Sequence, residues 1–301
     1  MSGTRLVTPP SVRALGKQAF RAYGIATFPV RPQPEFVIIG AKRAGTTSLY
    51  RYLLSHPQLL SLFPSAAMLP MADNMKGVHY FDTGYEHGTA WYRSHFPSRL
   101  PRGITALRHS EPVVVGEASP YYLFHPLAAG RAADTIPRAK LIVMLRDPVA
   151  RTYSHYCEQR RNGVETLSFE DALEAESDRL MGEEERLCRD AHSYSFAHEH
   201  QSYAAQSVYL PALRRWRDRF PSEQVLVVRS EDFYEFPQTI YDQVVDFLGL
   251  PARRLDDPKP WNISGGTAMA TETRLRLESQ FAASMGALEE YLNRDLRWGS
   301  R

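Results

Sequence analysis

The sequence predicts an α/β protein with a P-loop-like, mostly parallel β-sheet of about four to five strands flanked by helices. Two observations support this prediction. Short apolar runs alternate along the chain with segments whose apolar residues recur at helical spacing, which is typical of a doubly wound sheet. A glycine-rich loop directly follows the first apolar run, as in proteins that bind phosphate at a strand end. The expected strands are residues 36–39, 113–117, 140–146 and 224–229.

The first expected strand, Phe36–Ile39, leads into a glycine-containing loop and then into a segment with helical spacing. We call residues 40–47 the phosphate loop. Glycines let the backbone approach an anion closely, and free N–H groups at the start of a helix point toward it. The pattern therefore predicts a phosphate site, to which Lys42 or Arg43 would add positive charge. The alternative is a plain glycine turn that joins a strand to a helix.

The phosphate loop differs from the loops that bind nucleoside triphosphates at one position. A Walker A loop carries a lysine directly after its last glycine, whereas Thr46 follows Gly45 in this sequence. Thr46 and Thr47 offer hydroxyl donors instead. The loop thus favours binding of a phosphate group and argues against a P-loop kinase or NTPase.

A second set of anion-binding residues follows the third expected strand, which ends at Arg146. A helix is expected to start directly afterwards, with Asp147 as its cap and Pro148 in its first turn. Arg146 at the strand tip and Ser154 two turns into the helix are placed to bind a second phosphate, because arginine makes forked, charge-assisted contacts. The alternative is that Arg146 pairs with a carboxylate and that Ser154 lies on a helix face.

Residues 76–82, which we call the acceptor segment, combine aromatic side chains with His79 and Asp82. Such a mixture suits a surface that receives a small molecule, although most of the aromatics are expected in the core. His79 is the first candidate for a general base, because imidazole titrates near neutral pH. Glu117, at the end of the second expected strand, and Asp82 are the reserve candidates.

Composition narrows the function classes. Lysine and arginine number 36 against 34 acidic residues, a net charge of +2, which argues against a nucleic-acid-binding protein driven by bulk charge. No apolar run approaches the length of a membrane span. Cys157 and Cys188 form no zinc pattern, which favours a reduced, cytoplasmic setting and leaves a single disulfide open. Histidines 192, 198 and 200 lack a pattern of completing ligands, so no metal is predicted.

The first 31 residues contain arginines and a lysine but no acid. They predict either a basic helix that makes peripheral contact with anionic lipid, or an arm that packs on the domain or frays. Three prolines between residues 29 and 34 mark a boundary. The expected organisation is a basic N-terminal arm over residues 1–34 and a single domain over residues 35–301.

Several motifs occur in a fixed order along the chain: GAKRAGTTSL, KGVHYFD with WY and FP downstream, GEASPYY, LRDPVARTYSHY, SVYLPALRRW, FP-EQVLVVRSEDF and DFLGLP. In these motifs the sequence, from about Phe36 to Trp298, resembles the sulfotransferases that use PAPS (3′-phosphoadenosine-5′-phosphosulfate). It is most similar to the heparan sulfate N- and 3-O-sulfotransferase branch and its bacterial relatives. The resemblance implies the sulfotransferase fold, PAPS as donor and no metal.

The resemblance also implies roles for matching positions. The 5′-phosphosulfate would lie on Gly40, Ala41, Lys42, Arg43, Ala44, Gly45, Thr46, Thr47 and Ser48. Arg43 takes the place of the usual catalytic lysine. The 3′-phosphate would lie on Arg146 and Ser154, with Tyr209 near the nucleotide. A loop of Ser264, Gly265, Gly266 and Thr267 would close over the donor.

Three positions depart from the family pattern. Arg43 replaces a lysine, although Lys42 is adjacent and could substitute for it. Gly77 stands where the family carries the glutamate that acts as base, and Ala118 stands where a lysine is common. These departures leave His79 as the leading candidate for the base, with Glu117 in reserve.

The sequence thus predicts transfer of a sulfuryl group from PAPS to a hydroxyl or amine of a carbohydrate, glycolipid or small molecule, with release of adenosine 3′,5′-bisphosphate. Two alternatives are a non-catalytic module that binds this nucleotide or a glycan, which the glycine at position 77 would favour, and a P-loop kinase-like enzyme. The particular acceptor and the oligomeric state do not follow from the sequence.

Overall fold

The structure is a computed structural model, and it describes residues 10–65, 68, 76–109, 113–256 and 269–298. Its centre is a five-stranded sheet in the order β2-β3-β1-β4-β5, and every neighbouring pair of strands is parallel. The prediction of a mostly parallel sheet of four to five strands is confirmed. The strands are β1 (Phe36–Gly40), β2 (Leu59–Leu60), β3 (Val114–Ala118), β4 (Lys140–Leu145) and β5 (Val225–Arg229).

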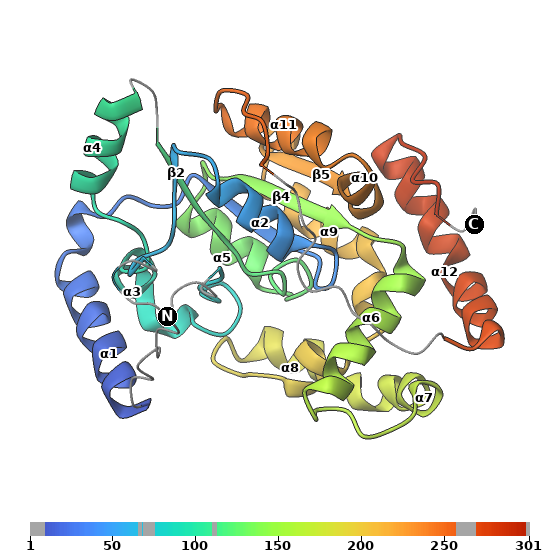
Figure 1. The fold of residues 1–301 in the computed structure, drawn as a ribbon. Helices are drawn as coiled ribbons and strands as arrows, with labels where there is room; N and C mark the ends of the chain where they lie inside the picture. Colours follow the sequence, from blue (N-terminus) through green and yellow to red (C-terminus); the bar gives the residue numbers. More distant parts are fainter. Residues whose placement is uncertain (1–9, 66–67, 69–75, 110–112, 257–268, 299–301) are drawn as a thin grey trace, which may run out of the picture.

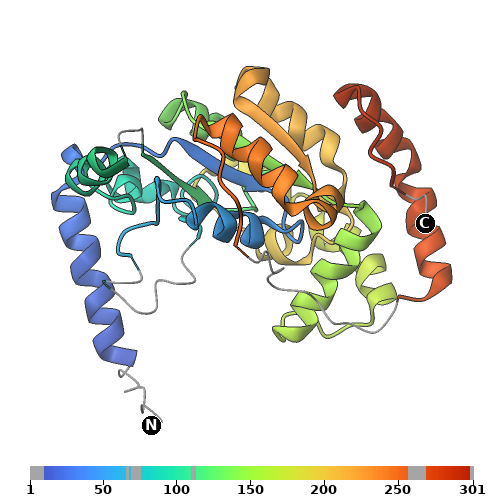
Figure 2. The same cartoon turned by 45° about the horizontal axis from the view of Figure 1, so that its top comes forward.

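Helices cover both faces of the sheet (Figures 1 and 2). The α-helices described are α1 (Pro10–Ala26), α2 (Thr46–Leu54), α3 (Gly88–Arg93), α4 (Arg99–His109), α5 (Ala128–Thr135), α6 (Pro148–Arg161), α7 (Phe169–Leu180), α8 (Glu183–Arg189), α9 (Tyr209–Arg217), α10 (Ser230–Glu235), α11 (Pro237–Leu248) and α12 (Thr271–Leu292). Short 3-10 helices are η1 (Phe28–Val30), η3 (Tyr85–His87), η5 (Ala205–Ser207) and η6 (Ser222–Gln224), and η4 (Ala197–Gln201) is a π-helix.

Local sequence signals explain where several helices begin and end. The side chain of Asp147 accepts a hydrogen bond from the Ala150 amide at 2.7 Å, and Pro148 opens α6, as the sequence predicts. The hydroxyl of Ser168 caps α7 in the same way, by accepting from the Asp171 amide. Gly249 ends α11 with a φ of +76°, a conformation that glycine adopts without strain.

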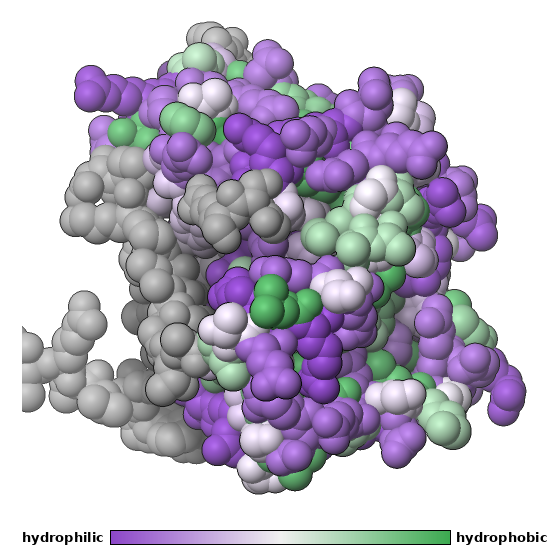
Figure 3. All heavy atoms as spheres, turned by 90° about the vertical axis from the view of Figure 1, so that its right-hand side faces the viewer, coloured by the Kyte–Doolittle hydropathy of each residue, from purple (hydrophilic) through white to green (hydrophobic). Residues whose placement is uncertain are grey.

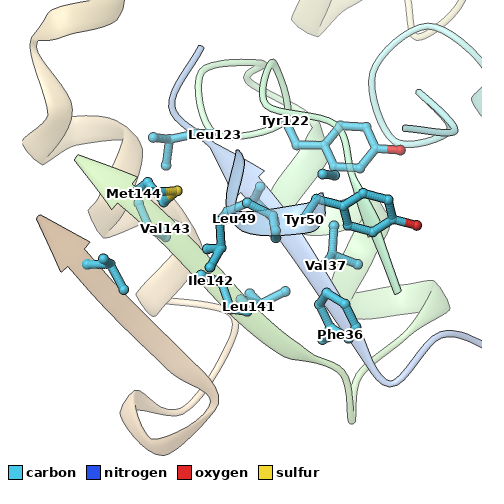
Figure 4. Packing of buried hydrophobic residues seen from close by; sticks show 14 of the residues in the cluster. Phe36, Val37, Leu49, Tyr50, Tyr122, Leu123, Leu141, Ile142, Val143 and Met144 are labelled. Carbon is cyan, nitrogen blue, oxygen red and sulfur yellow. The ribbon is translucent and has the colours of Figure 1, made fainter. Parts of the chain in front are cut away.

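The main core lies between the sheet and its flanking helices. β1 is buried along its whole length, and so is β4 apart from its first residue, as expected for strands covered on both faces. Figure 4 shows Leu49 and Tyr50 of α2 packed over Val37 of β1 and Ile142 of β4. This packing fixes the start of α2 over the end of β1, where the phosphate loop lies.

A second, smaller core joins α6, α7 and α12. It includes Val149, Tyr156, Phe169, Leu277 and Phe281. In both ribbon views α12 lies at one end of the molecule and α1 at the other (Figures 1 and 2). Hydrophilic residues cover most of the described surface at the α12 end, which Figure 3 shows.

The ends of the described chain pack on the domain. In the N-terminal region the ring of Phe20 lies edge-on to Phe63 at 5.7 Å, and Arg21 donates to the Ser94 hydroxyl at 2.7 Å. At the other end Trp298 donates to Glu231 at 3.0 Å, which docks this tryptophan on the domain. The division into residues 1–34 and 35–301 stays a prediction.

The order of the strands positions the functional site. From β1 the chain leads to β2 and β3 on one side, and β4 and β5 then lie on the other side of β1. The carboxyl ends of β3, β1 and β4 therefore lie next to one another at a topological switch point, the place where open α/β sheets bind ligands. The phosphate loop, the residues after β3 and the residues after β4 all meet at this edge.

Candidate active site

The phosphate loop runs from the end of β1 into the first turn of α2. Two of its residues, Arg43 and Gly45, have left-handed backbone angles, with φ of +72° and +92°. A side chain at Gly45 would also meet the Tyr234 hydroxyl at 2.8 Å, so this position requires glycine. The tight turn brings the first amides of α2, which have no acceptor within the helix, to the surface of the loop.

The side chain of Lys76, a residue without a predicted role, reaches the first residues of α2. Its ammonium donates to the hydroxyl of Thr47 at 2.6 Å and lies 3.4 Å from that of Thr46. Burial, the largest influence, lowers the pKa of Lys76 from 10.5 to about 8, and the cations of Arg43 and Lys42 contribute in the same direction. A positive charge is thus held beside the two hydroxyls that the phosphate loop presents.

The two sets of anion-binding residues meet at Arg43. The side chain of Arg146 donates to the backbone carbonyl of Arg43 at 3.0 Å, and the guanidinium of Arg43 donates to the Ser154 hydroxyl at 3.1 Å. Arg146 and Ser154 therefore face the phosphate loop. The same guanidinium donates to Glu158, one turn further along α6, at 2.5 Å.

Two further side chains bond the backbone carbonyls of residues that form this arrangement. Arg151 is fully buried and donates to the Ser207 hydroxyl at 2.6 Å and to the carbonyl of Lys42 at 3.4 Å. Tyr209 donates to the carbonyl of Arg146 at 2.8 Å. Tyr209 therefore positions a residue that contacts the phosphate loop, close to where the resemblance expects a nucleotide neighbour.

Within the acceptor segment, the imidazole of His79 is bonded to Asp82. Its Nδ1 lies 2.8 Å from the buried Asp82 carboxylate, while 44% of the His79 side chain is exposed. Burial, the largest single influence, acts to lower the pKa of His79, but the carboxylates of Asp82, Glu117 and Glu199 together outweigh it, so that the pKa lies above 6.5. The Asp82 contact orients one ring nitrogen and leaves the other for a reacting group, as in other histidine bases.

Glu117 is fully buried, and its oxygens accept four hydrogen bonds: from the Val78 amide and from the hydroxyls of Ser119, Tyr92 and Tyr122. Burial raises its pKa, and the bonds from Ser119 and Val78 oppose that rise. The Ser119 hydroxyl in turn accepts from the His79 amide at 3.0 Å. Glu117 thus anchors the acceptor segment to β3.

The glycine at position 77 has a steric reason. A Cβ atom there would lie 2.7 Å from the carbonyl of Ala118 and 2.7 Å from the Ser119 hydroxyl. The glutamate expected from the resemblance therefore has no room in this backbone. The lysine expected at position 118 is missing. The Ala118 amide donates to the backbone carbonyl of Lys76 at 2.6 Å, and the ammonium of Lys76 lies against the hydroxyls of Thr46 and Thr47.

Lys42 is directed toward η4. Its ammonium contacts the backbone carbonyl of Glu199 at 3.0 Å and the carboxylate of the same residue at 3.3 Å, and it lies 5.2 Å from the centre of the Tyr121 ring. Burial lowers the pKa of Lys42, and Glu199 opposes that effect. The lysine and the arginine of the phosphate loop are thus each paired with a carboxylate.

The other residues predicted for the site belong to the phosphate loop, to the start of α2 and to residues 264–267. Ala41, Ala44 and Ser48 are buried in the loop and the first turn of α2. The four residues from Ser264 to Thr267 lie outside the described residues. In the described part of the chain no cluster of three or more histidine, cysteine or acidic residues could hold a metal, and both cysteines are free.

Sequence reasoning missed four residues of the site: Lys76, Arg151, Glu158 and Glu199. One signal was available, because Ser154 and Glu158 are four residues apart and lie on the same face of α6. Lys76 and Glu199 belong to segments of irregular pattern, and their place beside the phosphate loop depends on how distant parts of the chain pack.

A parallel sheet whose switch point carries a glycine loop, hydroxyls and several cations is the arrangement typical of α/β proteins that bind phosphate groups. The profile described as the sulfotransferase family matches residues 34–254, and the chain belongs to that family. Among solved structures, a sulfotransferase from Alicyclobacillus acidocaldarius is 30% identical, with a TM-score of 0.63, over 88% of this chain and 97% of that chain.

Curated relatives point the same way. The membrane-associated sulfotransferase kil1 of Dictyostelium discoideum is 26% identical over 88% of this chain and 66% of its own length. The human bifunctional heparan sulfate N-deacetylase/N-sulfotransferase 3 is 30% identical over 72% of this chain but 22% of its own length. The human heparan sulfate glucosamine 3-O-sulfotransferase 3B1 is 28% identical over 72% of this chain and 46% of its own length. This chain therefore spans less than two thirds of each of these relatives.

Proposed function

We propose that this protein transfers the sulfuryl group of PAPS to a hydroxyl or amine of a glycan, glycolipid or small-molecule acceptor. The observation that supports this proposal most directly is the convergence on Arg43. Arg146 and Ser154, from β4 and α6, both contact this one residue of the phosphate loop, at 3.0 and 3.1 Å. Two sets of anion-binding groups this close together suit a nucleotide that carries phosphate at both its 3′ and its 5′ position.

The residues present fit such a donor. Its 5′-phosphosulfate would be bound by the phosphate loop, by the hydroxyls of Thr46 and Thr47 and by Lys76. Its 3′-phosphate would be bound by Arg146, Ser154 and the guanidinium of Arg43. In the reaction the acceptor oxygen or nitrogen bonds to sulfur, the bond from sulfur to the phosphate oxygen breaks, and the electron pair leaves on the phosphate.

Lys76 is the residue best placed to stabilise the negative charge that develops on the departing phosphate. Its ammonium already bonds the hydroxyl of Thr47, at the N-terminus of α2. Preorganised donors at such a position act without reorganisation during the reaction. We therefore assign to Lys76 the role that the family pattern gives to a lysine in the phosphate loop, with Lys42 in support.

His79 is the proposed general base. It would take the proton from the acceptor, and Asp82 would hold the imidazole and stabilise its charged form. Asp82 raises the pKa of His79. At acid pH a larger share of the enzyme therefore carries a protonated His79, which cannot act as a base. Glu117, whose carboxylate is enclosed by four donors, is proposed as a positioning residue for the acceptor segment.

The non-catalytic alternative makes a different prediction. A binding module would retain adenosine 3′,5′-bisphosphate but would not transfer sulfate. A kinase-like enzyme would use ATP, and Thr46 in place of the Walker lysine argues against it. Incubation with sulfur-labelled PAPS, acceptor mixtures and a cell extract distinguishes the three. We expect the wild type to form a labelled product. If the double variant Lys76→Met with His79→Ala formed as much labelled product as the wild type, the proposal would be contradicted.

We also propose that the end of the molecule formed by α1 and α4 contacts anionic lipid. Both helices lie at this end (Figures 1 and 2), and neither contains an acidic residue. Leu15 on α1 and Leu100 and Leu107 on α4 are exposed by 68%, 73% and 83%, an arrangement suited to a membrane surface. The described chain has no helix with the length and hydropathy of a membrane span. A cytoplasmic location stays a prediction.

Co-sedimentation with vesicles tests this second proposal. Wild type should sediment with vesicles that contain phosphatidylserine and stay in solution with pure phosphatidylcholine. Leu100→Ser with Leu107→Ser should lose this binding. Leu275→Ser is the matched control, because Leu275 is 60% exposed on α12 at the opposite end. Equal sedimentation of all three proteins would contradict the proposed membrane contact.

A further inference from the structure

Two acidic side chains hold the cations of the phosphate loop. Glu158 on α6 lies 2.5 Å from the guanidinium of Arg43, and Glu199 in η4 lies 3.3 Å from the ammonium of Lys42. The side chains of the two pairs are between 10% and 24% exposed, so solvent screens them only in part. These carboxylates come from segments about 40 residues apart, and the fold brings both to the same short loop.

A bound donor would place its own negative groups against these cations. Two anions that share one cation at short range repel each other, and the cation cannot satisfy both fully. Ser154, which offers its hydroxyl beside Arg43, is one helical turn before Glu158, so an anion there approaches the carboxylate closely. The free protein thus holds its loop cations in pairs that an incoming anion must compete with.

One of these carboxylates, Glu199, also borders the acceptor side of the site. Glu199 lies 3.6 Å from the imidazole of His200, and its ammonium partner Lys42 lies over the ring of Tyr121, which follows β3. The carboxylate of Glu199 also acts on His79, whose pKa it helps to raise. A carboxylate released from Lys42 therefore remains near the proposed base.

We propose that Glu158 and Glu199 pair with the loop cations until the donor binds, and that Glu199 then selects for a neutral or amine-bearing acceptor over a polyanionic one. This inference rests on the proposed function and refines its acceptor class. A polyanion would meet the carboxylate of Glu199 near the proposed base, and like charges at short range cost binding energy. An amine or a neutral hydroxyl could donate a hydrogen bond to this carboxylate.

Two of the relatives described above are named for heparan sulfate, a polyanionic glycan. The carboxylate of Glu199 predicts that this chain, although it belongs to the same family, does not favour such an acceptor. It also predicts that the donor binds before the acceptor, because donor binding frees the carboxylates.

The first test measures binding of adenosine 3′,5′-bisphosphate by calorimetry. Glu158→Gln and Glu199→Gln should each tighten binding by about fivefold, because each removes a competing, partly exposed ion pair. Glu174→Gln is the matched control, since Glu174 is 72% exposed on α7 and pairs with Arg276 at 3.8 Å. Thermal melting confirms that each variant folds. Unchanged affinity in both site variants would overturn the inference.

The second test compares acceptors by consumption of PAPS. Wild type should use an amine-bearing or neutral glycan at least tenfold better than a heparan-type polyanion. Glu199→Gln should narrow this difference, whereas Glu158→Gln and Glu174→Gln should keep it. A wild-type preference for the polyanion would overturn the inference. If wild type and variants all fail to bind the bisphosphate, the proposed function itself is contradicted.

Discussion

The lowered pKa of Lys76 leads to a prediction about proton uptake. Its ammonium lies between the hydroxyls of Thr46 and Thr47, and burial lowers its pKa from 10.5 to about 8. A shift of this size corresponds to about 3 kcal/mol of free energy disfavouring the charged form. A bound phosphosulfate or phosphate would offset much of that free energy, so donor binding should raise the pKa of Lys76 and draw a proton from solution.

The expected uptake follows from the titration of the free protein. With a pKa of about 8, Lys76 is about half protonated at pH 8 and about nine-tenths protonated at pH 7. If the complex is fully protonated, binding of adenosine 3′,5′-bisphosphate takes up about half a proton at pH 8 and about a tenth of a proton at pH 7. Uptake should therefore grow steeply between these two pH values.

Calorimetry in buffers of different ionisation enthalpy measures this uptake directly. Lys76→Met should abolish the increase between pH 7 and pH 8. Lys17→Met, the same substitution at an exposed lysine of α1, should leave it unchanged. The Lys76 variant should also lose about a hundredfold in kcat, the usual effect of removing one preorganised donor to a developing anion. Equal proton uptake by wild type and Lys76→Met would refute the reasoning.

Three other predictions concern the base, the acceptor segment and acid stability. His79→Ala should lower kcat by roughly a hundredfold with little change in bisphosphate affinity, and near-normal turnover in steady-state assays would remove His79 from its role. Gly77→Glu, which would restore the family glutamate, should lower stability by about 1–3 kcal/mol without raising activity, because its Cβ would overlap Ala118 and Ser119; melting and turnover measurements check both parts. Burial holds the pKa of His155 well below 6.5, so the folded protein keeps this imidazole neutral while the unfolded chain gains a proton below pH 6.5. The free energy of unfolding should therefore decrease as the pH drops below 6.5, and His155→Phe should reduce that decrease by about 1 kcal/mol at pH 5.5 in denaturant titrations. An equal decrease in both proteins would contradict this prediction.

Much of the fold was predictable because its signals are local. The apolar runs became β1, β3, β4 and β5, and the cap at Asp147 starts α6 as expected. The two-residue strand β2 was not predicted, since Leu59–Leu60 is too short to show a period. Its place at the edge of the sheet comes from pairing with β3, a contact between distant segments.

In the site, too, the residues with local sequence signals were predictable, and those placed by contacts between distant segments were not. The phosphate loop, Arg146 and Ser154 were predicted because they follow recognisable strands, and strand ends converge at the switch point of a parallel sheet. The absence of a glutamate at position 77 was visible in the sequence, but its reason was not. That reason is the carbonyl of Ala118 and the hydroxyl of Ser119, which fill the space where a side chain would begin.

By itself, the sequence determined the parallel sheet, the glycine loop proposed to bind phosphate and the family, because each is signalled by short patterns of residues that are neighbours in the chain. Tertiary packing alone decided that Lys76 lies against the hydroxyls of α2 and that Glu158 and Glu199 pair with Arg43 and Lys42. The physical reason is that a charge acts over a few ångströms of space, and residues 29 to 157 positions apart reach that distance through the packing of the whole domain.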